Sequence, residues 1–136
     1  MKANFKNFEL RDVFVGEKSS LWYENNQENH YKIYVKNTKT GAKTSFDFWT
    51  SKASPRIKTE YDLLNAFYCF VSDAVAGNES FESFCDEFGY NNDSIKAYKT
   101  YKACVRSYNK FLHVSNFLSI ENGIYDFINE LQEIAG

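Results

Sequence analysis

Apolar and polar residues alternate along the first part of the chain with the two-residue period of a β-strand. Between the last two alternating runs, Asn37 and Gly41 are residues that readily adopt the positive φ that a hairpin loop requires. The three runs cover residues 8–15, 31–35 and 45–49. The pattern predicts a three-stranded antiparallel β-meander within about residues 5–51.

From about residue 59 onward, apolar residues recur every three or four positions, which is typical of amphipathic helices. Thr59 with Asp62 resembles a capping box at the start of the first helix, Asp93 is the expected N-cap of the third, and Gly89 is expected to end the second. The spacing predicts four helices, over residues 61–76, from Asn78 or Ser80 to 88, over 94–113 and from about 119 to 134.

The large apolar side chains mark the face that each helix is expected to bury. In the first helix these are Tyr61, Leu64, Tyr68, Val71 and Val75, with Leu63, Phe67 and Phe70 beside them. In the third helix they are Tyr98, Tyr101, Val105, Tyr108 and Leu112. In the last helix they are Ile120, Ile124, Phe127, Ile128, Leu131 and Ile134.

The order of these elements predicts the fold class. A chain of 136 residues corresponds to a single domain by the usual size of domains. Strands come first and helices follow, separated by residues 51–58, which contain the only proline, Pro55. We therefore expect an α+β domain over residues 1–136, in which the β-meander packs against a C-terminal bundle of about four helices at residues 59–134.

Composition and charge narrow the environment of the protein. The formal net charge is −2, which gives no overall attraction to nucleic acid or to an anionic membrane. No stretch has the length and apolarity of a signal peptide or of a membrane span, so a cytoplasmic protein with no membrane partner is expected. Cys69, Cys85 and Cys104 occur singly in helical patterns, which favours reduced, largely buried thiols over disulfides or a zinc site.

The sequence contains no motif of a known catalytic or cofactor site. The only histidines are His30 and His113, and their spacing to the cysteines matches no metal-ligand signature. Cys104 and His113 would lie about 13 Å apart along one helix, too far for a nucleophile and its base. The glycines are isolated, so a phosphate-binding loop is absent. We expect a binding protein that uses neither metal nor cofactor, and not an enzyme.

The charges of the helical part change sign abruptly. Every charged residue between Asp73 and Asp93 is acidic, and every charged residue between Ser94 and Ile120 is basic. The acidic residues can imitate phosphates in the basic channel of a nucleic-acid-handling enzyme. The candidate partner-binding residues are Glu79, Glu82, Asp86, Glu87 and Asp93, together with Tyr34 and Trp49, which are expected to share the face of the meander that points away from the core.

The basic residues of the helix at 94–113 form an alternative binding face. Their spacing of three and four positions places them along one continuous ridge, which could neutralise several phosphates while Tyr98 or Tyr101 stacks on a base. The residues of this ridge are Lys96, Lys99, Lys102, Arg106 and Lys110. Its other interpretation is a solvated face paired with neighbouring acidic helices.

The segment YDLLNAFYCFVSDAVAGNESFESFCDEFGYNNDSIKAYKTYKAC resembles the characteristic segment of a widespread family of small proteins of bacteriophages and prophages. The runs DVFVGE and SFDFWTS are similar to the N-terminal strands of that family. The resemblance implies a viral accessory protein in the host cytoplasm, a class rich in inhibitors of host defence. We therefore expect an anti-CRISPR-like inhibitor that binds and blocks a host defence protein complex such as a CRISPR effector. The alternative is a nucleic-acid-binding accessory protein, and an exposed edge of the meander leaves a homodimer open.

Overall fold

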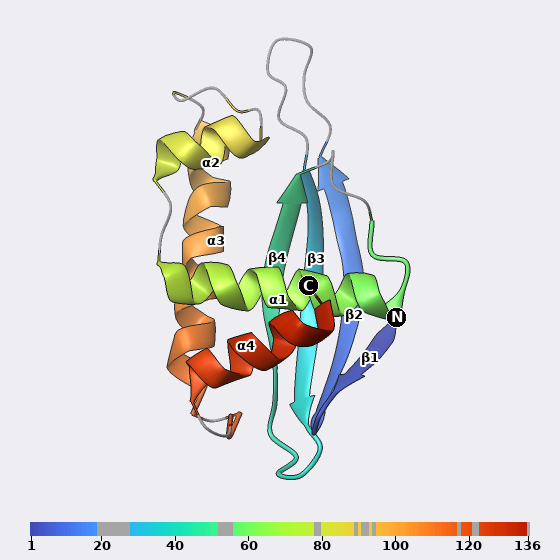
Figure 1. The fold of residues 1–136 in the computed structure, drawn as a ribbon. Coiled ribbons are helices and arrows are strands. Elements are labelled where there is room, and N and C mark those ends of the chain that lie inside the picture. Colours follow the sequence, from blue (N-terminus) through green and yellow to red (C-terminus); the bar gives the residue numbers. More distant parts are fainter. Residues whose placement is uncertain are drawn as a thin grey trace.

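The computed structural model describes residues 1–18, 28–51, 56–77, 80–88, 90, 93, 95–116, 118–120 and 123–135. These residues form one antiparallel sheet and four helices (Figure 1). The strands are β1 (Lys2–Phe5), β2 (Phe8–Lys18), β3 (Glu28–Asn37) and β4 (Lys43–Ser51), in the spatial order β1-β2-β3-β4. The helices are α1 (Glu60–Ala76), α2 (Phe81–Phe88), α3 (Ile95–Val114) and α4 (Ile124–Ala135). The α+β class and the four helices are confirmed.

The sheet has four strands in the described residues, so the expected three-stranded meander is corrected. The additional strand, β1, pairs with β2 through Ala3 with Leu10 and Phe5 with Phe8, and its apolar residues are buried. Lys6 turns the chain with a φ of 51°. A strand of four residues holds too little alternation to be recognised, and this turn lacks the glycine that usually marks a positive φ.

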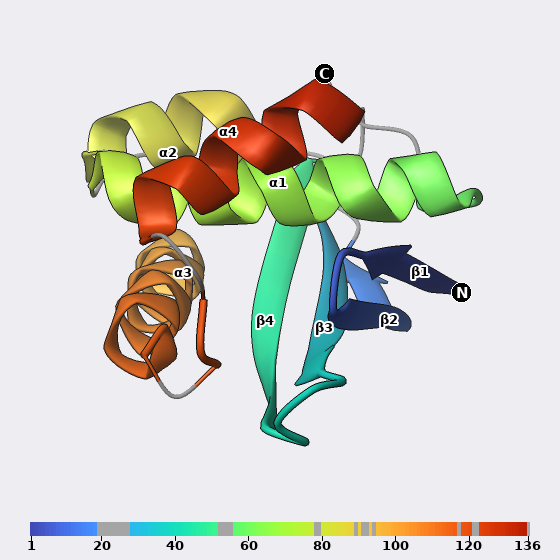
Figure 2. The same cartoon turned by 60° about the horizontal axis from the view of Figure 1, so that its bottom comes forward.

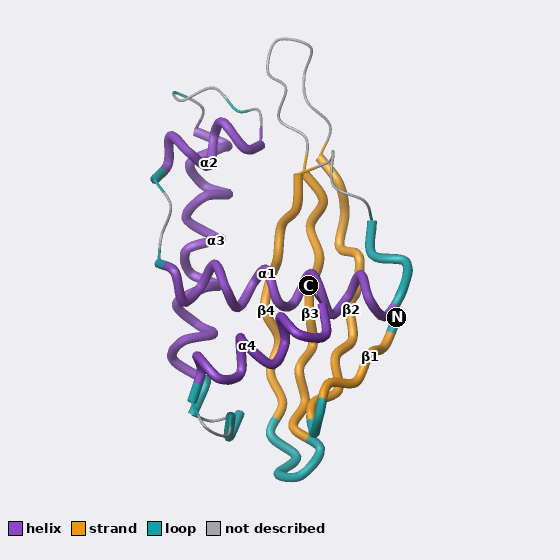
Figure 3. The backbone as a smooth tube through the Cα atoms, in the orientation of Figure 1, coloured by secondary structure: helices purple, strands orange, loops and turns teal. Residues whose placement is uncertain are grey.

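The helices cover one face of the sheet and one of its edges. Figure 1 shows α1 and α4 crossing in front of the strands, and Figure 2 shows both on the same side of the sheet, with α3 beside β4. In the tube of Figure 3, α3 runs along the strands and not across them. No described helix covers the opposite face of the sheet, which we call the open face.

Aromatic rings join the covered face of the sheet to the helices. Phe46 of β4 lies 5.3 Å from the ring centre of Phe70 in α1 and 5.4 Å from that of Phe111 in α3. Phe127 of α4 contacts Phe5 and Phe8 in edge-to-face geometry at 5.5 and 5.4 Å. Such pairs stabilise a core beyond the area that they bury. The core therefore draws on strands and helices from both halves of the chain.

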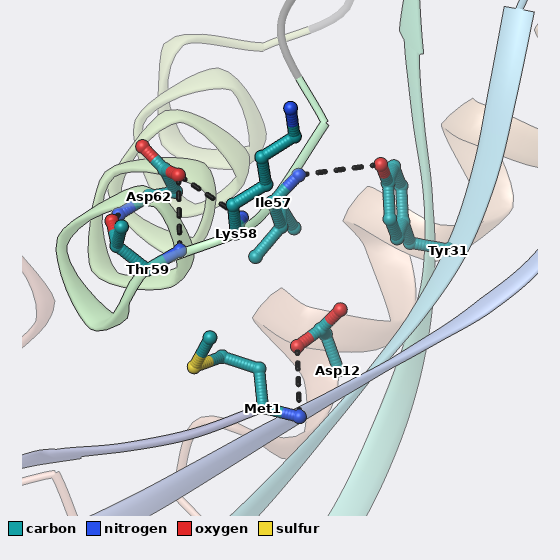
Figure 4. Close-up of polar contacts among 7 residues, drawn as sticks. All are labelled: Met1, Asp12, Tyr31, Ile57, Lys58, Thr59 and Asp62. Carbon is teal, nitrogen blue, oxygen red and sulfur yellow. Dashed lines mark hydrogen bonds and ion pairs between the residues drawn. The ribbon is translucent and has the colours of Figure 1, made fainter.

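The predicted capping box begins α1 (Figure 4). Thr59 Oγ1 accepts a hydrogen bond from the amide of Asp62, and Asp62 Oδ2 accepts from the amides of Thr59 and Lys58, all at 3.0–3.1 Å. The same figure shows the amide of Ile57 donating to the Tyr31 hydroxyl and the amino group of Met1 facing Asp12. The bond between Ile57 and Tyr31 attaches the residues just before α1 to β3.

The buried stripe of α1 differs from the expected one. The residues that α1 buries are Leu63, Leu64, Ala66, Phe67, Phe70, Val71 and Ala74, whereas Tyr61 is 56% exposed. Leu63, Phe67 and Phe70, expected beside the main stripe, are at the centre of the buried face. Small alanines take part because a helix that crosses the sheet approaches it closely where its side chains are short.

The inner face predicted for α3 is also wrong in part. The helix buries Ala97, Thr100, Cys104, Ser107 and Phe111, while Tyr98 and Leu112 are exposed. Small side chains allow α3 to lie close against β4. The larger rings of Tyr101 and Tyr108 lie at the flank of this contact, where Tyr101 packs against Phe81 and Phe84 of α2. The largest side chains of α3 therefore do not mark its buried face.

Two smaller expectations are corrected as well. The helix α4 starts at Ile124, later than the expected residue 119, after Gly123 with a φ of 87°. Phe127 and Leu131 are buried as predicted, but Ile134 is exposed. All three cysteines are thiols; Cys85 and Cys104 are buried as expected, and Cys69 is exposed.

Candidate nucleic-acid interface

The open face of the sheet carries basic side chains and two stacked ring pairs. Because side chains alternate along each strand, the residues between the buried positions of β1 to β4 all point to this face. Its cationic side chains are Lys2, Arg11, Lys32, Lys36 and Lys43. Among the side chains that the structure describes on this face, the carboxylates of Glu9 and Asp47 lie between these cations. The face is thus locally basic in a chain of negative net charge.

The helix α3 extends this face beyond the edge of β4. The hydroxyl of Ser107 donates a hydrogen bond of 2.6 Å to the backbone carbonyl of Asp47, and Lys110 Nζ donates to the carbonyl of Ser45. These carbonyls belong to the outer edge of β4, so α3 covers an edge that could otherwise pair with another strand. Within the described sheet, the other edge is the short strand β1.

The helix places its basic residues outward, as the sequence predicts. Lys96, Lys99, Lys102, Arg106 and Lys110 are all exposed. Lys102 Nζ lies 5.5 Å from the ring centre of Tyr98, whose ring in turn contacts Phe81 of α2. Lys96 and Lys99 instead turn toward the open face, where they border a concavity shared with the sheet.

This first concavity lies between β3, β4 and α3. Its volume is about 300 Å³, and it is lined by His30, Trp49, Lys96, Lys99, Thr100 and Ala103. The imidazole of His30 stacks on the indole of Trp49 with ring centres 4.5 Å apart and planes 10° apart. His30 Nε2 is 2.9 Å from Asp47 Oδ1, which fixes the orientation of the imidazole. The concavity therefore combines a preformed ring stack with two ammonium groups.

A second concavity lies further along the open face, over β2, β3 and β4. Its volume is about 480 Å³, and it is lined by Glu9, Arg11, Tyr34, Val35, Lys36, Lys43, Thr44 and Ser45. The guanidinium of Arg11 lies 4.4 Å from the ring centre of Tyr34, a cation–π stack. Lys36 and Lys43 are register partners on neighbouring strands. This concavity repeats the combination of the first one, a stacked ring beside two lysines.

The two concavities have a defined spacing. His30 and Tyr34 are four residues apart on β3, which corresponds to about 13 Å along a strand. Lys32 lies between them on the same side of β3. We call the following residues together the basic face: Lys2, Arg11, His30, Lys32, Tyr34, Lys36, Lys43, Trp49, Lys96 and Lys99.

The structure separates two sets that the sequence analysis combined in one partner-binding surface. Tyr34 and Trp49 lie on the open face, within the basic face. Glu82 and Asp86 lie one turn apart on the exposed side of α2, and Asp93 is exposed before α3. Glu79 and the side chain of Glu87 lie outside the described residues. The rings are therefore surrounded by cations and not by the acidic group.

Sequence reasoning did not select the cations of the sheet. Lys32 and Lys36 occupy the polar positions of the strand alternation, so their shared face is readable from the sequence. The participation of Arg11 and Lys43 depends on the strand register, which pairs Arg11 with Tyr34 and Lys36 with Lys43. A periodic pattern gives the face of each strand but not the neighbours across the sheet.

The structure also places the residues that the sequence suggested for catalysis or metal binding. Cys104 is buried on the inner side of α3, while His113 is exposed near the end of the same helix. Within the described ranges, no three His, Cys, Asp or Glu side chains gather as metal ligands. Among the helices that the structure describes, none has the length and apolarity to cross a membrane.

Comparisons of the chain with protein-family models, with curated proteins and with solved structures give no match. The functional assignment therefore depends on the geometry and charge of the basic face.

Proposed function

We propose that this protein binds nucleic acid through the basic face. The observation that carries the proposal is the gathering of lysines and arginine around two ring stacks on one side of a chain whose net charge is −2. On the helical side, exposed residues such as Glu60, Glu82, Asp86 and Glu133 are acidic. These acidic residues belong to α1, α2 and α4 and lie outside the basic face. A locally basic surface binds phosphates even when the whole chain is acidic.

The cations supply the sequence-independent part of the binding energy. Each ammonium or guanidinium that neutralises a phosphate releases a condensed counterion, so affinity falls as salt concentration rises. Lys32, Lys36 and Lys43 extend from adjacent strands, and Lys99 adds a charge from α3 across the first concavity. These cations are therefore placed to contact successive phosphates of one backbone across the width of the sheet.

The ring stacks supply the contacts to bases. Nucleobases stack on aromatic rings, on histidine and on the plane of an arginine, and such contacts tolerate any base because every base has a π-face. In each concavity, the partner that covers the aromatic ring, His30 or Arg11, itself presents a flat surface. The stacks are therefore suited to adding a base as a further layer.

The test is binding of fluorescently labelled oligonucleotides, followed by fluorescence anisotropy at several salt concentrations. We expect the double variant Lys32→Glu/Lys99→Glu to bind about tenfold or more weakly, and its salt dependence to decrease by roughly 0.7–0.9 per lost phosphate contact. Lys58→Glu makes the same type of charge change at an exposed lysine before α1, outside the basic face, and serves as the control. Equal weakening by Lys58→Glu, or no binding by the unaltered protein at low salt, would contradict the proposal.

A second candidate function is supported by the acidic side of the molecule. Glu82 and Asp86 project from α2 and make no ion pair within the described residues, so their charges are available to a basic partner. This arrangement suits the inhibitor expected from the phage resemblance, a protein that acts in the host cytoplasm by occupying the basic channel of a defence complex.

The inhibitor is tested with a purified CRISPR effector nuclease. We expect the protein to lower the rate of target cleavage, and Glu82→Lys/Asp86→Lys to abolish this effect. Glu133→Lys, at an exposed acidic residue of α4, is the matched control. If Lys32→Glu/Lys99→Glu abolishes inhibition and the α2 variant does not, the basic face is responsible and the acidic surface is not.

A further inference from the structure

We infer that the basic face selects single-stranded over double-stranded nucleic acid by holding one unpaired base in each of its two concavities. This inference rests on the proposed function, and it specifies the form of the ligand. DNA and RNA share the required chemistry, namely unpaired bases joined by a phosphate backbone.

The first concavity has the size and lining for one base. Its volume of about 300 Å³ lies at the lower end of small-ligand pockets. The Trp49–His30 stack provides flat surfaces. Thr100 and Ala103 of α3 also line the concavity, and their short side chains leave room for a base. Lys99 lies at the same concavity, where it can meet the phosphate attached to a bound base.

The second concavity offers the same elements at a distance suited to the same strand of nucleic acid. The Arg11–Tyr34 stack lies beside Lys36 and Lys43. Lys32 occupies the stretch of about 13 Å between the two stacks, where the backbone joining the two bases would pass. The nearby carboxylate of Asp47 is engaged by His30, which limits its repulsion of a phosphate.

A duplex cannot use these features. In a duplex the bases are stacked on each other and present only their edges in the grooves, so no base face reaches a protein ring without unstacking. An unpaired strand exposes its base faces at no such cost. The cations of the basic face would hold either form, but the two ring stacks would add affinity only for the single strand.

The experiment uses the intrinsic fluorescence of Trp49. The chain has two tryptophans, Trp22 and Trp49, so Trp22→Phe leaves Trp49 as the sole reporter. This variant is titrated with a twelve-nucleotide oligothymidine, with the same strand paired to oligoadenosine, and with oligouridine to separate DNA from RNA. We expect quenching of Trp49 and about tenfold tighter binding for the single strands than for the duplex.

Two further variants test the concavities separately. Ala103→Leu fills the first concavity without a change of charge, and Tyr34→Ala removes the ring of the second. Each is expected to weaken single-strand binding by about tenfold and to leave duplex binding unchanged. Ala76→Leu, at an exposed alanine at the end of α1, is the control for Ala103→Leu, and circular dichroism reports on folding. Because Tyr34 is on the surface, its variant tests the inference even if Ala103→Leu misfolds.

The outcomes distinguish the inference from the proposed function. Equal affinity for single strand and duplex, with no effect of Ala103→Leu or Tyr34→Ala, overturns the inference while the basic face remains a phosphate-binding surface. Absence of binding to all three probes overturns the proposed function and the inference together.

Discussion

The hydroxyl of Ser107 in α3 donates a hydrogen bond of 2.6 Å to the backbone carbonyl of Asp47 in β4, sixty residues away in the sequence. The carbonyl lies on the outer edge of the sheet, and Ser107 is buried. The bond holds α3 against β4, and thereby brings Lys99 to the concavity that contains Trp49.

Replacement of Ser107 by alanine removes this bond and leaves the carbonyl of Asp47 without its side-chain donor. We expect Ser107→Ala to lower the free energy of unfolding by about 1 kcal/mol, measured by urea denaturation. Ser115→Ala, which loses a bond within its own chain segment to the carbonyl of Leu112, is the control and should change stability by less than about 0.5 kcal/mol. Equal losses of unfolding free energy in the two variants would show that the bond to β4 stabilises the fold no more than a local hydrogen bond does.

Asn37 is expected to be the most sensitive polar residue of the sheet. Its buried side chain donates to the carbonyl of Leu118 at 2.8 Å and accepts from Asn7 Nδ2 and from the amide of Lys39 at 2.9 Å each. It thus joins the β1–β2 turn and the β3–β4 turn to the segment before α4. Asn37→Ala leaves the buried carbonyl of Leu118 and two partly buried donors without this partner, and should cost roughly 2 kcal/mol of unfolding free energy.

The control for Asn37→Ala is Asn65→Ala on the exposed side of α1. Thermal and urea unfolding of both variants should give a large loss for the first and almost none for the second. A loss below about 0.5 kcal/mol for Asn37→Ala would mean that solvent replaces these hydrogen bonds at little cost.

The capping box predicts a pH dependence of stability. Hydrogen bonds from the amide of Lys58, and then from Thr59, hold the pKa of Asp62 below its ordinary value of 3.8. Because the folded pKa is the lower one, the stabilisation is complete above the ordinary pKa and disappears as the pH falls through the folded value. Asp62→Asn retains an oxygen acceptor without ionising, so its stability should decrease less than that of the unaltered protein between about pH 5 and pH 2.

The same helix start is tested by Thr59→Ala, which removes the acceptor for the amide of Asp62. We expect a loss of about 1 kcal/mol in unfolding free energy at neutral pH. Parallel pH profiles for the unaltered protein and Asp62→Asn would contradict the role of Asp62 as an ionised cap.

The cysteines are expected to differ in reactivity. Partial burial of the Cys69 thiol, and then the nearby carboxylate of Asp73, raise its pKa above the ordinary value of 9.0. Cys69 should therefore react with iodoacetamide at pH 8 more slowly than a free cysteine, and Asp73→Asn should accelerate it. Cys85 and Cys104 are buried and should react only after unfolding. Mass spectrometry of partly labelled protein checks the order, and fast labelling of either buried thiol would contradict it.

The local features of the fold could be predicted because each depends on residues close in the sequence. The capping box at Thr59 and Asp62 needs four neighbouring residues, and the bounds of α2 follow from its short amphipathic pattern. The strand β1 was missed because its four residues and its turn at Lys6 carry no strong local signal. The buried face of α3 was misplaced because packing beside β4 favours Ala97 and Ser107 over the larger Tyr98 and Leu112.

By itself the sequence determined the periods of the elements, the capping box of α1, the exposure of the basic residues of the third helix and the outward placement of Tyr34 and Trp49. Only the tertiary structure decided that the described helices leave one face of the sheet uncovered, that Arg11 meets Tyr34, and that Lys99 comes beside Trp49. The physical reason is that amphipathic periods and caps arise from neighbours along the chain, whereas the grouping of charges and rings on one surface requires contacts between segments that are distant in sequence.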